Sequence, residues 1–260
     1  MHKYAIGALF FLGIWFVLFA CVRKSRKPML WSSLALGHAG PISQYWHVRD
    51  YWSPIYIAKI QIGNWVFGLE DYLFAFAFAG ICSGIFDLLA RKSGQKELLQ
   101  FDPMGFLGSI LFGLACLLVM GVLIVFLKLN SLHAIVVAFL ISAAIILARR
   151  PKLITPAVQA AFIAAVAMWI FYRGFFLQLF PRIVSEWWNV NALSGMTMGG
   201  VPIEEVIWAW TAALFAGPAI RYCMGRSIDT KLMKIVIQDP PEKYGDSPTL
   251  DSSEISNANQ

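Results

Sequence analysis

The sequence predicts an all-α, polytopic membrane protein in which about seven transmembrane helices form two parallel three-helix repeats and a linking helix. Hydrophobic residues make up 58% of the 260-residue chain and charged residues only 14%, a balance that is not typical of a water-soluble domain. The apolar residues are gathered in long runs, and a spanning helix needs about 20 of them to cross roughly 30 Å of hydrocarbon. Basic residues cluster between alternate runs, which favours a membrane bundle with a fixed orientation.

Six runs are long and apolar enough to be spanning helices. They are residues 4–22, 69–90, 104–127, 131–148, 153–172 and 202–220. Each is bounded by basic residues or by a turn. A seventh, weaker run at 29–45 is short and contains Gly37, His38, Gly40 and Pro41, so its apolar pattern alone does not establish a helix.

The distribution of basic residues supports this seventh helix. If all seven runs cross, most of the 21 Lys and Arg residues fall on one side, in the segments 23–27, 91–96, 149–152 and 221–234. Without the seventh helix these clusters would be scattered over both faces. The positive-inside rule then predicts an N-terminus outside and a C-terminus in the cytoplasm.

We expect a single integral membrane domain over residues 1–234. Residues 235–260 lack apolar periodicity and contain Pro240 and Pro241, which predicts a disordered cytoplasmic tail. The first run is not expected to be a signal peptide, because no small-x-small cleavage site follows it and the next residues are basic.

Several other classes of function are not supported by the sequence. The four cysteines stand singly, with no C-x-x-C pair, so neither a disulfide framework nor a zinc site is predicted. The net charge of +6 reflects topology rather than nucleic-acid binding, because no basic and aromatic patch accompanies it. With no phosphate loop and no G-x-G-x-x-G motif, we expect no cofactor and no metal.

An internal repeat relates the two halves of the chain. The run 67–76 aligns without a gap with the run 201–210. The aligned pairs are Glu70 with Glu204, Asp71 with Glu205, Phe74 with Trp208, and Phe76 with Trp210. Repeat one then covers about 4–90, the linking helix 104–127 and repeat two about 131–222. A single linking helix keeps both repeats in the same orientation, so both acidic pairs are expected at the outer ends of their helices.

The paired acids allow two interpretations. Acids in the first turn of a helix stabilise the positive end of its macrodipole by about 0.3 to 1 kcal/mol each, and Pro202 suits a first helical position. Two adjacent acids at membrane depth, given twice, exceed what a cap requires and are typical of a proton or substrate pathway. Burial and a like-charged neighbour raise the pKa of a carboxyl group, which is how a general acid is made.

Aromatic residues accompany the acids. Phe74, Phe76, Trp208 and Trp210 lie within two helical turns of an acidic pair, and a residue four positions after an acid shares its helix face. Their π-faces can stabilise a developing carbocation, although core packing is an equally good explanation. Trp52, in the loop before the first pair, fits either an interfacial belt or a substrate site.

An acidic pair followed by paired aromatics occurs twice, and the second copy reads Pro-x-Glu-Glu. This pattern resembles the lycopene cyclase domain of the small membrane type, found in archaea, actinobacteria and fungi. The best local match is the segment 50–74, where Trp52, Pro54, Tyr56 and the run 69–71 fall in the family's order, and a second match is 200–210.

The chain departs from the family pattern at three places. Gly68 stands where the family usually has Pro, and Asp71 stands where Glu is common. The second loop offers Glu186 in place of an Asp-x-x-x-Pro run.

The resemblance implies an acid-catalysed, redox-neutral isomerisation, the reaction of an intramolecular lyase. An acid protonates the terminal double bond of a linear carotene, the cation closes to a β-ionone-type ring, and loss of a proton restores an alkene. The resemblance assigns the proton donor to Glu70 and Asp71 or to Glu204 and Glu205, without choosing between the pairs. It assigns Asp50 and Glu186 to support or to a proton relay. It assigns the aromatics to substrate binding and cation stabilisation: Phe74, Phe76, Trp208, Trp210 and Trp52.

The expected partners are membrane lipid and a hydrophobic isoprenoid or carotenoid substrate. A homo-oligomer or an association with other carotenoid enzymes is compatible with the sequence, and the expected location is a bacterial plasma membrane. The alternative function is a proton-coupled transporter or a non-catalytic membrane protein that uses the acids as a relay. A retinal-binding protein is disfavoured, because the run 202–220 has no lysine for a Schiff base.

Overall fold

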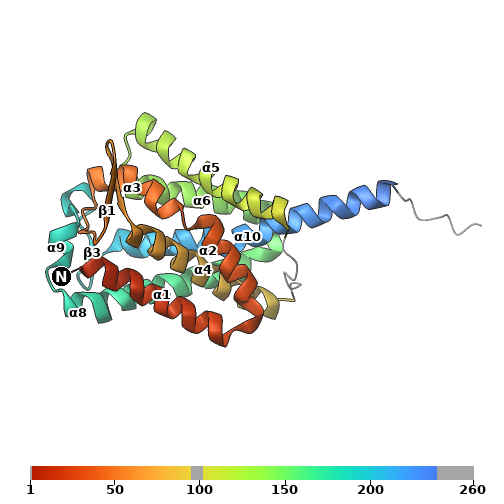
Figure 1. Ribbon diagram of the computed structural model, residues 1–260, viewed down its shortest axis with the longest axis horizontal. Coiled ribbons are helices and arrows are strands. Elements are labelled where there is room, and N and C mark those ends of the chain that lie inside the picture. Colours follow the sequence, from red (N-terminus) through yellow and green to blue (C-terminus); the bar gives the residue numbers. More distant parts are fainter. Residues whose placement is uncertain (1, 95–101, 239–260) are drawn as a thin grey trace, which may run out of the picture. The chain divides into compact units, whose positions relative to one another are not determined.

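The computed structural model describes residues 2–94 and 102–238, with side chains placed up to Gly225. It divides into two compact units, Met1–Ser227 and Ile228–Gln260. The first unit is built almost entirely of helices (Figure 1). The prediction of an all-α polytopic membrane protein is confirmed. The predicted disordered tail lies outside the described residues from 239 onwards.

Six stretches of helix in the described residues are long and apolar enough to cross a membrane, and they confirm the six strong runs. They are α1 (Lys3–Cys21), α4 (Leu69–Lys92), α5 (Pro103–Leu127), α6 (Ser131–Arg149), α7 (Ile154–Ile170) with its continuation, and α10 (Ile203–Gln238) as far as Gly225. Helix α7 continues as a π-helix, η3 (Phe171–Phe176), and then as α8 (Leu177–Leu179). Short helical turns are η1 (Arg23–Ser25), η2 (Pro151–Leu153), α9 (Ile183–Trp187) and η4 (Val190–Ala192).

The weak seventh run forms two consecutive helices, α2 (Arg26–Leu36) and α3 (Ala39–Asp50), separated at Gly37 and His38. Together they run antiparallel to α4: Met29 lies at Gly84, and Gly40 lies at Asp71, near the start of α4 (Figure 1). The seventh run therefore accompanies α4 along much of its length.

This placement explains why the hydropathy of the seventh run is weak. The side chains of Ser32 and Ser33 are fully buried and hydrogen-bonded: Ser32 Oγ donates to the carbonyl of Ala79 at 3.2 Å, and Ser33 Oγ accepts from Trp15 Nε1 at 2.9 Å. A helix enclosed by other helices can carry small polar residues that lipid would not tolerate, since its neighbours satisfy them.

An antiparallel two-stranded hairpin immediately precedes each acid-bearing helix. Strands β1 (Lys59–Ile62) and β2 (Trp65–Gly68) lead into α4, and strands β3 (Thr197–Met198) and β4 (Val201–Pro202) lead into α10. Glycines with positive φ form both turns, at Gly63, Gly199 and Gly200. No strands were predicted from the sequence, because these are too short to show alternation. Their equivalent positions agree with the repeat, which otherwise stays a prediction.

The two loops before these hairpins are paired with each other. The backbone N–H of Ser53 donates to the carbonyl of Trp187, and the N–H of Asn189 donates to the carbonyl of Tyr51, both at 2.8 Å. Trp52 and Trp188 therefore face each other as a single antiparallel bridge. This pairing brings the loop before α4 and the loop before α10 to one end of the bundle.

Candidate active site

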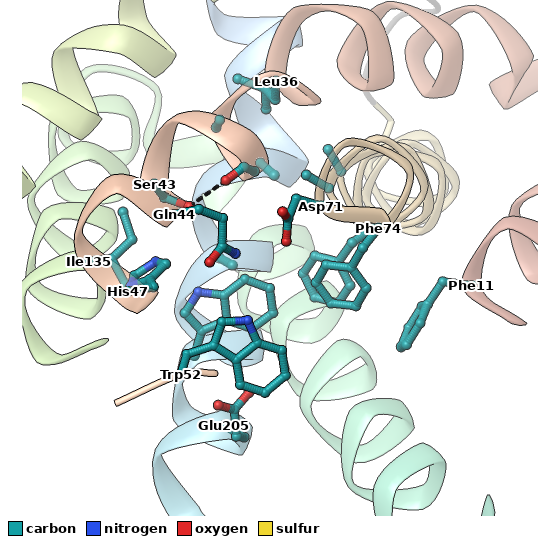
Figure 2. A pocket seen from close by; sticks show the side chains of 18 of the residues that line it. Phe11, Leu36, Ser43, Gln44, His47, Trp52, Asp71, Phe74, Ile135 and Glu205 are labelled. Carbon is teal, nitrogen blue, oxygen red and sulfur yellow. Dashed lines mark hydrogen bonds between the residues drawn. The ribbon is translucent and has the colours of Figure 1, made fainter. Parts of the chain in front are cut away.

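A cavity of about 160 Å³ lies inside the bundle, between the paired loops and the middle of the helices. Its wall is mostly aromatic and aliphatic, with residues from α1, α2, α3, α4, α5, α6, η3 and α10. Among the lining residues, two carry carboxyl groups: Asp71 from α4 and Glu205 from α10 (Figure 2). An apolar cavity with few, convergent polar groups is typical of a small-molecule site.

Asp71 is fixed by the way α4 begins. One carboxyl oxygen, Oδ2, accepts the backbone N–H of Gly68 at 2.8 Å, which caps the helix, and Oδ1 accepts the hydroxyl of Tyr4 at 2.7 Å. The Tyr56 hydroxyl, from the loop before α4, is buried near the same carboxyl group. Burial and the nearby carboxylates of Asp71 and Glu70 raise the pKa of Tyr56, so this phenol stays protonated.

Glu205 has an analogous environment. Its Oε1 accepts the indole N–H of Trp188 at 2.8 Å, and the Tyr172 hydroxyl from η3 faces the same carboxyl group. Trp188 and the backbone of Gly68 can only donate, whereas a tyrosine hydroxyl can donate or accept. The hydroxyls of Tyr4 and Tyr172 can therefore accept a hydrogen bond from a protonated carboxyl group of Asp71 or Glu205.

The first acid of each pair is turned away from the cavity. Glu70 Oε1 accepts the N–H of Ile57 at 2.6 Å, and Glu204 Oε1 accepts the N–H of Ser194 at 2.7 Å. Both side chains are buried, and neither lines the cavity. These two carboxylates tie the loops to the starts of α4 and α10.

Some of the predicted aromatic residues line the cavity, and others lie away from it. Phe74 and Trp208 line the cavity and stack on each other, with ring centroids 5.9 Å apart and planes inclined by 27°. Trp52 also lines it (Figure 2). Phe76 instead packs near Trp15, with centroids 5.3 Å apart, and Trp210 lies in a shallow apolar groove between α7 and α10.

Asp50 lies just outside the cavity. Its Oδ2 accepts the backbone N–H of Ser131 at 2.6 Å, and its Oδ1 accepts the Ser131 hydroxyl at 2.7 Å, which caps α6. Glu186 is partly exposed and pairs with Lys3, which lowers the pKa of the Glu186 carboxyl group.

The structure also brings residues to the cavity that were not predicted from the sequence. Tyr4 and Phe11 of α1, Trp187 of α9, and Gln44 and His47 of α3 all line it. The sequence signal for Tyr4 is weak, because it is a single polar residue at the start of an apolar run. The π-helical turn η3 places Phe171, Tyr172 and Phe176 on the cavity wall, and such turns are frequent at functional sites.

A family model described as lycopene cyclase matches residues 130–222, from the start of α6 into α10. Over this segment the chain is similar to the lycopene cyclase family. The predicted resemblance is thereby confirmed over residues that include Glu205, Trp208 and Trp188. The match supports carotenoid cyclase activity in general, and with the apolar helices it fits a hydrophobic carotenoid substrate in a lipid membrane. Among curated proteins and solved structures, none matches the chain.

Proposed function

We propose that this protein is an intramolecular lyase that closes the end group of a linear carotene such as lycopene to a β-ionone-type ring within the membrane. The observation that carries the proposal is the pair of carboxyl groups, Asp71 and Glu205, that face one apolar, aromatic cavity. The lycopene cyclase match over residues 130–222 supports the same reading.

The reaction needs one proton given and one proton taken. A carboxyl group at the cavity protonates the terminal double bond of the carotene, and the resulting cation is attacked by a second double bond of the chain to form the six-membered ring. Loss of a proton from the ring restores an alkene, so no electron is gained or lost. Asp71 and Glu205 are the proposed donors, since each faces a tyrosine hydroxyl that can accept a hydrogen bond from the protonated acid.

The aromatic wall has a defined part in this proposal. Phe74, Trp208 and Trp52 present rings to the cavity, and the negative face of an aromatic ring attracts a positive charge by about 2 kcal/mol when both are desolvated. These rings stabilise a cation formed between them, and they present no nucleophile that would react with it. The wall also excludes water, which would otherwise capture the cation as an alcohol.

The test is expression in bacteria engineered to accumulate lycopene, followed by chromatography of the extracted carotenoids. We expect the wild-type chain to convert lycopene to cyclised carotenes. We expect Asp71→Asn and Glu205→Gln to reduce conversion by about 100-fold or more where the substituted group is the donor, the range that general acids contribute.

The matched controls are Glu70→Gln and Glu204→Gln, which remove a charge at the neighbouring position but not from the cavity. We expect these variants to retain more activity than the cavity-facing substitutions. Unchanged lycopene in cells whose membranes contain the wild-type protein would contradict the proposed function. Full activity in both Asp71→Asn and Glu205→Gln would remove these two groups from the mechanism.

A further inference from the structure

A buried histidine faces the cavity from α3, an element that carries neither of the two cavity-facing acids. His47 is only 6% exposed and lines the cavity beside Gln44, one helical turn earlier (Figure 2). The mechanism proposed above supplies a proton donor but assigns no group to receive the proton that leaves the ring. His47 and Gln44 offer lone pairs on this wall, and Gln44 Oε1 has no hydrogen-bond partner among the described residues.

A chain of hydrogen bonds fixes which nitrogen of His47 carries hydrogen. Asp50 accepts both the backbone N–H and the hydroxyl of Ser131, at 2.6 and 2.7 Å. Because the single hydroxyl hydrogen of Ser131 goes to this carboxylate, the Ser131 oxygen is left as an acceptor for His47 Nδ1, 2.8 Å away. His47 therefore holds its hydrogen on Nδ1, and Nε2 keeps a lone pair.

The surroundings keep the imidazole neutral. The ring is buried, and it hydrogen-bonds to a hydroxyl group rather than directly to a carboxylate. Asp50 lies at the N-terminus of α6, where it accepts the Ser131 N–H. Asp50 orients Ser131 through two hydrogen bonds, and Ser131 orients the ring.

We propose that His47 Nε2 accepts the proton that the ring cation loses, with Ser131 and Asp50 as positioning residues. This inference rests on the proposed cyclase function. In the step, a C–H bond next to the cationic carbon breaks, its electron pair forms the ring double bond, and the proton goes to Nε2. The imidazolium then releases that proton, and the carboxyl group that began the reaction regains one, so the protein returns to its starting state.

A weak base is sufficient for this step, because a carbon beside a cationic centre gives up its proton readily. What the protein must control is which carbon loses the proton, since that choice sets the position of the ring double bond. A lone pair held in one orientation by two hydrogen-bonded residues provides such control.

If His47 had a purely structural role, its hydrogen bond to Ser131 would only hold α3 against α6. One variant distinguishes this structural role from the role of a base. In His47→Asn, the side-chain amide occupies the place of Nδ1 and still donates to Ser131, but no lone pair remains at the place of Nε2. We expect this variant to accumulate in membranes and to unfold at the wild-type temperature in detergent. We expect its cyclisation rate to fall about tenfold or more, with an altered ratio of ring double-bond isomers.

Ser131→Ala is the second variant. It leaves the imidazole in place but removes the acceptor for Nδ1, so we expect a smaller loss of rate and again a changed isomer ratio. His38→Asn is the matched control, because His38, which immediately precedes α3, is a histidine that does not line the cavity. We expect His38→Asn to give the wild-type isomer ratio.

The measurement is the conversion of lycopene by membranes from each strain, with the ring isomers separated by chromatography and identified by NMR. An active wild type with a wild-type rate and isomer ratio in both His47→Asn and Ser131→Ala would overturn the inference alone. A wild-type protein that leaves lycopene unchanged would overturn the proposed function, and the inference with it. A loss of rate with an unchanged isomer ratio in His47→Asn would assign the residue a structural role and also overturn the inference.

Discussion

Glu70 and Asp71 are neighbours on α4, and neighbouring side chains on a helix point about 100° apart around its axis. One carboxyl group can therefore hold the loop before the helix while the next one faces the cavity. Glu204 and Glu205 divide in the same way on α10. The sequence predicted these pairs, but it could not say which member faces inward, because that depends on how all the helices pack around the cavity.

Two tryptophans of α10 also point in different directions around the helix axis, so they can be compared by matched substitutions. Trp208 lines the cavity, whereas Trp210 lies in the groove between α7 and α10. We expect Trp208→Leu to slow cyclisation by roughly 30-fold, the equivalent of about 2 kcal/mol of lost cation stabilisation. Trp210→Leu should stay within about twofold of the wild type. Equal losses in both variants, measured at equal protein levels, would argue for packing rather than cation stabilisation.

At the scale of helices, the strong runs were predictable because lipid-facing helices must be apolar along their whole length. The seventh run was recognised from the distribution of basic residues rather than from hydropathy, and the structure shows it as α2 and α3 beside α4. The paired hairpins and loops were not predictable, since the strands β3 and β4 have two residues each. His47 was missed because its role depends on Ser131, which is distant in the sequence.

The close contact between α3 and α4 depends on Gly40. A Cβ atom on Gly40 would lie 2.2 Å from the backbone oxygen of Asp71 and 2.8 Å from the Cβ of Ala75, so one helix would have to move. We expect Gly40→Ala to lower the unfolding temperature in detergent and to reduce cyclisation, because the shift displaces Asp71.

Gly13→Ala on α1 is the control, since a Cβ there meets nothing within 4 Å. We expect this variant to unfold at or above the wild-type temperature, because alanine stabilises a helix interior by up to about 1 kcal/mol relative to glycine. Similar unfolding temperatures for the Gly40→Ala and wild-type proteins would contradict the close packing of α3 on α4.

For the whole molecule, the orientation in the membrane is a prediction from charge. Basic residues gather in the segments 23–27, 91–96, 149–152 and 221–234, which predicts that the C-terminus is cytoplasmic and the loop before α4 is outside. We expect a green fluorescent protein fused after residue 234 to fluoresce, and an alkaline phosphatase fused in the turn at Gly63 to be active. The opposite pattern would reverse the topology.

The most direct test of a proton-initiated cyclisation is the isotope content of the product. Purified protein in liposomes containing lycopene, transferred to heavy water, should yield cyclised carotene with one deuteron bound to carbon for each ring closed, because the donor carboxyl group exchanges with solvent before it reacts. We expect Asp71→Asn or Glu205→Gln, whichever removes the donor, to abolish this incorporation. Cyclised product that contains no deuterium, or lycopene that remains unchanged, would contradict the account.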